Sequence, residues 1–203
     1  MPPIYHITPV DNLAGIIREG GLFCDRNAQD KQLVNIAHKN IKDRRIKKKV
    51  PINPGGVLAD YVPFYFAPRS PMLFTIYKGN VEGYVRGQEP IIYLVSSTET
   101  VDEAGLDWVF TDGHAVMDYT DFFDSFNDLD NVDWPLMSAH YWSDTDTDGD
   151  RRRRRQAEFL VHGFFPFELF SEIGVYNAAA AQRVGEILDG TEIPVSVKGA
   201  WYY

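Results

Sequence analysis

The sequence contains only one cysteine, Cys24, among 203 residues. A single cysteine excludes an internal disulfide and any zinc site built from several cysteines. No apolar run approaches the roughly 20 residues that a helix needs to cross a bilayer. The first ten residues also lack the basic and apolar regions of a signal peptide. These absences predict a soluble, cytoplasmic protein.

Several widespread enzyme motifs are missing as well. The sequence has no GxGxxG, GxxxxGK[ST] or GxSxG, which argues against Rossmann oxidoreductases, P-loop NTPases and α/β-hydrolases. Its five histidines show no HxxxH or HxH spacing. Residues 144–150, DTDTDGD, match the start of a calcium loop, but the twelfth position is Arg155 instead of glutamate. We therefore expect no metal site.

Positive charge is scarce overall and concentrated in two places. The formal net charge is −9, and residues 99–150 contain no lysine or arginine. Twelve of the 20 basic residues lie in two short windows, 38–49 and 151–155. Because a polyanion responds to the local field, these windows predict contacts to nucleic acid, while the acidic remainder would limit indiscriminate binding.

Hydrophobic residues make up 44% of the chain, and no linker divides it. We expect residues 1–203 to form a single domain of mixed α+β class with many short strands. Thr8 is expected to cap a first helix, and Pro63 to place its strand at an edge or a bulge. Expected strands lie at 3–7, 22–25, 61–67, 90–97, 108–115, 156–163, 172–176 and the C-terminus, and expected helices at 9–19, 70–79, 119–128 and 177–190. Between them we expect a long loop at 26–56 with one helical turn around 33–42.

The sequence RRRRRQAEFLVHG at 151–163 has more than one interpretation. The five arginines could be solvated, neutralised by the acidic residues at 144–150, or used to contact phosphates. In the strand that follows, Glu158 shares a face with Leu160 and His162. A glutamate there must be paired, exposed at the rim, or used in chemistry. His6 in IYHIT leaves a similar choice: it is either a hydrogen-bonded histidine of the core or a functional residue.

Four segments resemble one known family when they are read in order. They are IYHIT…NLAGIIREGGLFCD, HKNIKDRR…V, ADYVPFYFAPRSPML and RRRRRQAEFLVHG, and together they span nearly the whole chain. The set resembles DarT, the DNA ADP-ribosyltransferase toxins of DarTG toxin–antitoxin systems. The resemblance implies an ADP-ribosyltransferase fold with a split, curved β core and flanking helices. It also implies NAD as co-substrate, single-stranded DNA as acceptor with thymine as the base, and a macrodomain antitoxin, DarG, as partner.

The resemblance also assigns residues. It implies that Glu158 is catalytic, together with Arg44 or Arg45, which the sequence does not separate. The residues implied to bind NAD are His6, Thr8, Asn12, Arg44, Tyr65 and Ser70, with Met72 as a further pocket candidate. The loop before Glu158 is implied to read the acceptor. Its candidate DNA contacts are Arg151, Arg152, Arg153, Arg154, Arg155, Trp134, Met137, Tyr141 and Trp142.

Two other readings remain open at this stage. Gln156 stands two residues before Glu158, and a Q/E-x-E motif is typical of transferases that modify arginine, so the acceptor could be protein or RNA. A non-catalytic module that binds single strands through the two basic windows is the third reading. In each case we expect a monomer.

Overall fold

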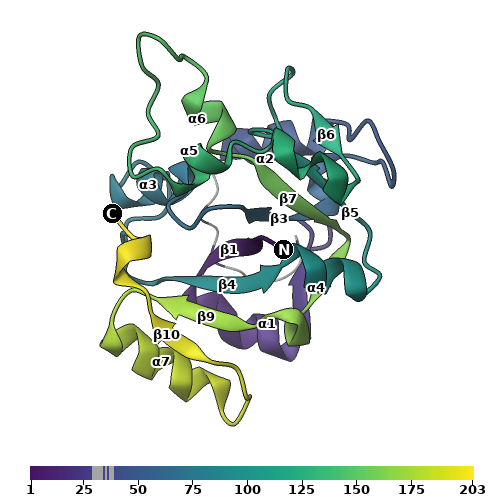
Figure 1. The fold of residues 1–203 in the computed structure, drawn as a ribbon. Coiled ribbons are helices and arrows are strands. Elements are labelled where there is room, and N and C mark those ends of the chain that lie inside the picture. Colours follow the sequence, from purple (N-terminus) through teal and green to yellow (C-terminus); the bar gives the residue numbers. More distant parts are fainter. Residues whose placement is uncertain (29–33, 35, 37–38) are drawn as a thin grey trace.

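The computed structural model describes residues 1–28, 34, 36 and 39–203 (Figure 1). The loop expected at 26–56 lies partly outside these residues, as does His38 in the first basic window. Within the described part, the helical turn expected around 33–42 corresponds to a longer helix, α2 (Lys39–Lys47), which begins and ends later in the sequence.

The described strands form one eight-stranded sheet and one short strand pair. The order in the large sheet is β10 (Val195–Val197), β9 (Glu172–Val175), β4 (Ile91–Ser97), β1 (Pro3–Pro9), β3 (Tyr61–Tyr65), β7 (Glu158–His162), β5 (Trp108–Thr111) and β6 (Phe122–Phe123). β2 (Gly21–Phe23) pairs with β8 (Phe164–Pro166). Every strand expected from the sequence has a counterpart here.

The large sheet divides at its centre. β1 pairs with β4 from Pro3 to Pro9, yet its register with β3 is the single pair Tyr5↔Tyr65. β3 in turn pairs with β7 along its full length. The two halves therefore meet at one point and diverge on either side of it. The expected α+β class and split β core are confirmed.

Helices flank both halves of the sheet (Figure 1). In Figure 1, α1 and α7 lie beside β9 and β4, whereas α5 and α6 lie beyond β7. The α-helices are α1 (Leu13–Arg18), α2, α3 (Pro71–Tyr77), α4 (Thr98–Glu103), α5 (Trp134–Ser138), α6 (Arg151–Arg154) and α7 (Ala178–Leu188). Short 3₁₀ turns are η1 (Val10–Asn12), η2 (Leu58–Asp60), η3 (Phe126–Asn131), η4 (Phe167–Leu169) and η5 (Gly199–Trp201).

Local sequence explains the best-defined elements. Ser70 Oγ accepts the Leu73 amide and Pro71 fills the first helical position, so α3 begins where the sequence predicts. Asn177 caps α7 by accepting from the Ala180 amide. β4 is buried along nearly its whole length because its residues pack into apolar clusters on both faces of the sheet. None of the described helices is long and apolar enough to span a membrane.

Two local expectations were wrong. Thr8 does not cap a helix, because β1 continues to pair with β4 as far as Pro9. The helix expected at 119–128 is replaced by β6 and the start of η3, because Phe123 stacks on Phe110 of β5 with ring centroids 5.1 Å apart.

The edge position expected for Pro63 was also wrong, since β3 lies between β1 and β7. The carbonyl oxygen of Pro63 accepts a hydrogen bond from His6 of β1, so this residue's backbone polar groups face the split. A missing N–H is tolerated there because the diverging strands offer it no ladder partner.

Candidate active site

A cavity of about 710 Å³ opens beside the split in the sheet. This volume lies within the roughly 300–1,000 Å³ typical of ligand and cofactor pockets. Residues from β1, α1, α2, β3, α3 and β7 contribute to its walls. Its polar and candidate lining residues are His6, Thr8, Asn12, Asp25, Arg45, Tyr65, Met72, His114 and Glu158.

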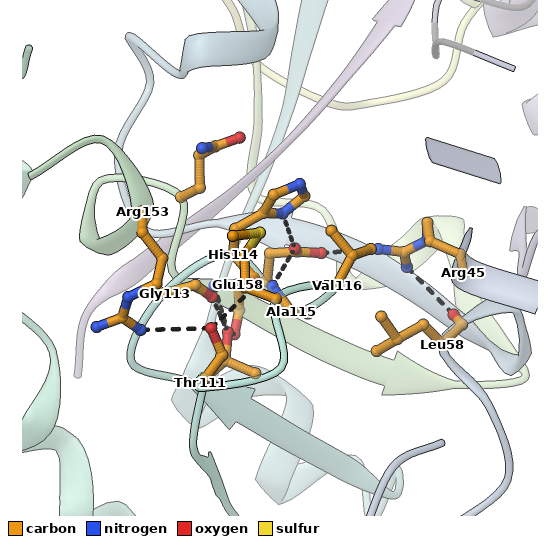
Figure 2. A network of polar contacts seen from close by, with 12 residues as sticks. Arg45, Leu58, Thr111, Gly113, His114, Ala115, Val116, Arg153 and Glu158 are labelled. Atoms are coloured by element: carbon orange, nitrogen blue, oxygen red, sulfur yellow. Dashed lines mark hydrogen bonds and ion pairs between the residues drawn. The ribbon is translucent and has the colours of Figure 1, made fainter. Parts of the chain in front are cut away.

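Glu158 is the centre of a buried polar cluster in this cavity (Figure 2). It begins β7 opposite Tyr65, and only 4% of its side chain is exposed. Arg45 Nη1 donates to Oε2 at 2.9 Å. His114 Nδ1 lies 3.2 Å from Oε1, and the Ala115 amide donates to the same oxygen at 3.1 Å. The sequence left three alternatives for this glutamate: it could be paired, exposed at the rim, or used in chemistry. Its burial excludes the rim position, and its contacts show that it is paired.

These contacts keep Glu158 ionised. Burial alone would raise the pKa of this carboxyl, but the Arg45 charge and the hydrogen bonds from His114 and Ala115 outweigh it and lower the pKa to about 2. A carboxylate has about four acceptor positions. Three of them are used here, so one position on Oε2 remains for a ligand.

The ionised carboxylate fixes the tautomer of His114. A carboxylate can only accept, so His114 Nδ1 must carry the hydrogen in the 3.2 Å contact. When the imidazole is neutral, its Nε2 therefore presents a lone pair. His114 lines the cavity, with 17% of its side chain exposed. The ring thus places a proton acceptor next to Glu158.

Arg45 comes from α2 and is buried between two acidic side chains. Its Nε lies 3.3 Å from Asp25, its Nη1 contacts Glu158, and its Nη2 donates to the Leu58 carbonyl at 3.2 Å. Two carboxylates thus surround one guanidinium. Arg45 and its two carboxylates together carry a net negative charge, which suits a site where positive charge develops.

His6 lies across the cavity on β1. Its Nδ1 donates to the Pro63 carbonyl at 2.9 Å, which leaves Nε2 as an acceptor. Burial lowers the pKa of this imidazole, so it is neutral at pH 7. Asn12 Nδ2 donates to Thr8 Oγ1 at 3.0 Å, and both side chains also line the cavity.

Of the remaining candidates for NAD binding, one lines the cavity and two do not. Tyr65 lines it, and its hydroxyl lies 3.5 Å from the sulfur of Met72. Ser70 is buried as the cap of α3 and is outside the lining. Arg44 is also outside it, since its Nη2 donates to the Val116 carbonyl at 3.0 Å. Of the two neighbouring arginines, the structure therefore brings Arg45 to the glutamate.

The arginine run is folded into its acidic surroundings. Residues 151–154 form one helical turn, α6, and the last arginine is 3% exposed. This arrangement agrees with the neutralisation that the sequence left open. The acidic partners are Asp144 for Arg152 at 3.8 Å, Asp112 at 2.9 Å and Asp150 at 2.8 Å for Arg153, and Asp148 at 2.6 Å and Asp133 at 3.1 Å for Arg154.

Arg153 also supports the loop that carries His114. Its carbonyl oxygen accepts the His114 amide at 3.0 Å, and its Nη1 donates to Thr120 at 3.3 Å. Gly113 makes this approach possible, because a Cβ there would lie 2.4 Å from Arg153 Nη1. Figure 2 shows Arg153 on one side of this loop and Glu158 on the other. Arg153 is thus placed as a positioning residue.

The four candidate base-stacking residues differ in exposure. Tyr141 is 81% exposed, whereas Met137 and Trp142 are buried. Trp142 donates to the Tyr203 hydroxyl at 2.8 Å. Trp134 is half-buried against Phe66 and donates to the Leu129 carbonyl at 2.9 Å. Tyr141 is therefore the most exposed of these rings, and Trp134 is accessible in part.

Sequence reasoning missed the partners of the glutamate. His114, Ala115 and Asp25 were not selected as site residues. His114 stands 44 positions before Glu158, in the turn TDGHA, and no spacing rule connects the two. The described residues contain no group of His, Cys, Asp and Glu suited to hold a metal ion.

Comparison with known proteins identifies the family. The family model for DarT, the ssDNA thymidine ADP-ribosyltransferases, matches residues 5–203. This chain belongs to that family. It is 47% identical over 205 residues to a DNA ADP-ribosyl transferase of Thermus sp. (strain 2.9), covering 99% of this chain and 96% of that protein.

Solved structures of Thermus sp. 2.9 DarT share the fold. The complex with ADP-ribosylated ssDNA has a TM-score of 0.94 and 46% identity and covers 100% of this chain and 96% of that one. The complex with NAD⁺ has a TM-score of 0.90 and 45% identity, covering 100% and 98%. The chain is therefore a DNA ADP-ribosyltransferase that uses NAD as its substrate, and the implied family and co-substrate are confirmed.

A more distant relative carries a second activity. The protein from Thermosipho africanus is a DNA ADP-ribosyl transferase–DNA ADP-ribosyl glycohydrolase fusion. It is 24% identical over 197 residues, which cover 95% of this chain and 47% of the fusion.

Proposed function

We propose that this enzyme transfers ADP-ribose from NAD to a thymine base of single-stranded DNA. In this reaction the bond between ribose C1′ and the nicotinamide nitrogen breaks, and nicotinamide leaves with the bonding electrons. A bond forms between C1′ and N3 of thymine, and the N3 proton passes to a base. The observation that supports this proposal best is the ionised Glu158, held by Arg45 and His114 in a cavity of suitable size.

Glu158 is proposed to stabilise the ribose as the nicotinamide leaves. Such displacements pass through an oxocarbenium-like state that carries positive charge. An ionised carboxylate with one free acceptor position can bind the ribose 2′-hydroxyl and offset that charge. The role suits a pKa of about 2, because the group has to remain charged. The same value makes Glu158 a poor proton acceptor near pH 7.

His114 is the better candidate to accept the thymine proton. Its Nδ1 donates to Glu158 and the residue lines the cavity, so its Nε2 lone pair can accept a proton from a bound base. The imidazolium that would form is stabilised by the adjacent carboxylate. Glu158 and His114 would then divide the two tasks between them, one assisting departure of nicotinamide and the other assisting attack by the base.

Arg45 is proposed to fix the geometry of this pair. Its guanidinium contacts Glu158, Asp25 and the Leu58 carbonyl, so it holds the carboxylate in one orientation. On the other side of the cavity, the neutral His6 can accept from a ribose hydroxyl through Nε2. Thr8, Asn12 and Tyr65 supply further polar groups along the wall.

A single strand presents the target thymine more readily than a duplex does. N3 of a paired thymine lies inside the base pair, so a duplex would have to open first. The exposed ring of Tyr141 can stack with a base of a flexible strand. Arg152, with 63% of its side chain exposed, is the member of the run best placed for a phosphate contact.

The biological setting follows from the same proposal. We infer that residues 1–203 act as one domain and as a monomer in the cytoplasm, where NAD and DNA are both present. We also infer that the enzyme is a toxin whose partner is a macrodomain antitoxin, DarG. The glycohydrolase fused to the Thermosipho africanus relative supports a partner that removes the modification.

The test is a mass-spectrometric assay on oligonucleotides. The protein is incubated with NAD and matched single-stranded DNA, duplex DNA and RNA, with a thymine-free single strand and Glu158→Gln as controls. We expect one ADP-ribose on the thymine-containing single strand only, and none with the variant. Modification of RNA or of the protein itself instead would favour the alternative acceptors, and NAD left intact would favour the binding module.

A further inference from the structure

The pairing of β5 with β7 stops one residue short of Glu158. The last paired residues are Phe110 and Phe159, and the next positions along the two strands are Thr111 and Glu158. After Thr111 the chain leaves β5 and turns into the loop that carries His114. A buried backbone amide at such a point needs an acceptor outside the ladder. The Glu158 amide finds it in a side chain, because it donates to Thr111 Oγ1 at 3.0 Å.

The Thr111 hydroxyl makes a second hydrogen bond, to the loop itself (Figure 2). Its Oγ1 donates to the Gly113 carbonyl oxygen at 2.7 Å and lies 3.4 Å from the Glu158 carbonyl oxygen. A hydroxyl carries one hydrogen, so the shorter contact takes it. Thr111 is fully buried, which keeps water from competing for either bond. One oxygen atom therefore connects the backbone of Glu158 to the residue before His114.

This connection completes a ring of contacts around the catalytic carboxylate. On the backbone side, Glu158 is joined through Thr111 to Gly113. On the side-chain side, its Oε1 is joined to His114 at 3.2 Å and to the Ala115 amide at 3.1 Å. The loop is thus attached to both ends of the same residue. Its position relative to the carboxylate is fixed as long as the hydroxyl is present.

We propose that Thr111 is a positioning residue that holds the proton-accepting imidazole of His114 in place beside Glu158. This inference rests on the proposed function, since it assumes that these two side chains divide the reaction between them. Thr111 is outside the cavity lining, so it acts through the loop and not on a substrate. Without its hydroxyl, the Glu158 amide and the Gly113 carbonyl would both be buried without this partner, and the loop would move to satisfy them.

Transfer kinetics of variants at this hydroxyl test the proposal. Thr111→Val keeps the side-chain volume and removes the hydroxyl, whereas Thr111→Ser keeps the hydroxyl. Thr98→Val is the matched control, because Thr98 is equally buried and its hydroxyl has no hydrogen-bond partner in the described part of the chain. We expect transfer to single-stranded DNA to fall at least about tenfold in Thr111→Val, with the KM for NAD changed less than about twofold. The other two variants should stay near the wild-type rate.

A spectroscopic readout separates positioning from a loss of stability. Nitrogen NMR of ¹⁵N-histidine, assigned with His114→Asn and recorded at alkaline pH, reports which ring nitrogen carries the hydrogen. We expect the Nδ1–H tautomer of His114 in the wild type, Thr111→Ser and Thr98→Val. In Thr111→Val the contact to Glu158 is loosened, so the Nε2–H tautomer should also be populated. A Thr111→Val protein that is less stable but keeps the wild-type tautomer would overturn the proposal.

A second pair of variants covers the case in which Thr111→Val does not fold. Thr111→Ala and Thr111→Ser also differ by one hydroxyl, and the same differences in rate and tautomer are expected between them. In a His114→Asn background, removal of the hydroxyl should slow transfer by less than about threefold, because the imidazole that it positions is gone. Equal losses in the two backgrounds would overturn the role of Thr111.

The same measurements distinguish this inference from the proposed function. A wild type that modifies no DNA would contradict the proposed function. The tautomer of His114 in the Thr111 variants would still decide whether this hydroxyl positions the imidazole, since that readout needs neither NAD nor DNA.

Discussion

The backbone amide of His114 donates a hydrogen bond to the carbonyl oxygen of Arg153 at 3.0 Å. Through this bond the arginine run supports the loop whose other side contacts Glu158. The run therefore has a structural task that its charge alone does not suggest. It holds part of the site in place while its own charge is largely neutralised by the acidic segment before it.

Arg153→Gln is predicted to slow the reaction without weakening NAD binding. The variant loses the ion pairs to Asp112 and Asp150, so the loop and α6 are no longer joined by this side chain. A displacement of the order of 1 Å can cost about 100-fold in rate. Steady-state kinetics should show a lower kcat with little change in the KM for NAD. Arg152→Gln removes the exposed neighbour proposed to contact a phosphate, so at saturating DNA it is the control: it should leave kcat unchanged and raise only the KM for DNA.

Gly113→Ala is predicted to reproduce the defect of Arg153→Gln. The added Cβ would lie 2.4 Å from Arg153 Nη1 and 2.9 Å from its Cζ, so the guanidinium has to move. Since both changes disturb one contact, their effects on kcat should not add in the double variant. Additive losses would show that glycine and arginine act independently.

Arg45→Gln and Arg44→Gln are predicted to differ sharply. Loss of Arg45 leaves Glu158 buried without its cation, and such a change typically destabilises a protein by about 3–5 kcal/mol. Transfer should fall at least about 100-fold. Arg44→Gln removes a part-buried contact to the Val116 carbonyl and an exposed contact to the Met117 sulfur, and it should reduce thermal stability and activity little. Thermal unfolding and transfer assays on the two variants check this, and similar losses in both would contradict the assignment.

The effect of Glu158→Gln on the rate is predicted to be independent of pH above about 5. The pKa of Glu158 is lowered from its ordinary 4.5 to about 2, so the carboxylate is fully ionised from pH 5 upward. Its contribution to folding is present above pH 4.5 and is lost as the pH falls toward 2. The ratio of wild-type to variant rates should therefore be constant from pH 5 to pH 9. A ratio that shrinks steadily below pH 7 would show that Glu158 titrates there.

His114→Asn is predicted to separate the two halves of the reaction. The asparagine amide can still donate to Glu158, but the variant has no nitrogen lone pair to accept the thymine proton. Transfer to DNA should fall while loss of nicotinamide to water continues. Raising the pH, which removes the N3 proton in solution, should restore part of the transfer. No recovery at high pH would argue against His114 as the proton acceptor.

Local signals in the sequence account for much of the fold. The apolar run of β4, the Ser70–Pro71 start of α3 and the Asn177 cap of α7 are each determined by neighbouring residues. The predicted helix at 119–128 failed because a contact distant in sequence, Phe123 on Phe110, decides that segment. Helical propensity is a weak preference that such packing overrides.

The site was less accessible to sequence reasoning. Glu158 and His6 could be selected through the family resemblance, but Arg45 could not be separated from Arg44. The distinction depends on a hydrogen bond across 113 positions of sequence. His114 was missed because only the folding of the loop after β5 against α6 brings it to the carboxylate.

The account rests most directly on Glu158 acting during bond cleavage and not in the binding of NAD. We would measure the NAD dissociation constant by calorimetry and the rate of nicotinamide release in a single turnover with saturating single-stranded DNA, for the wild type and Glu158→Gln. The account predicts dissociation constants that agree closely and a rate of release that falls at least about 100-fold in the variant. A variant that releases nicotinamide nearly as fast as the wild type, or that no longer binds NAD, would contradict it.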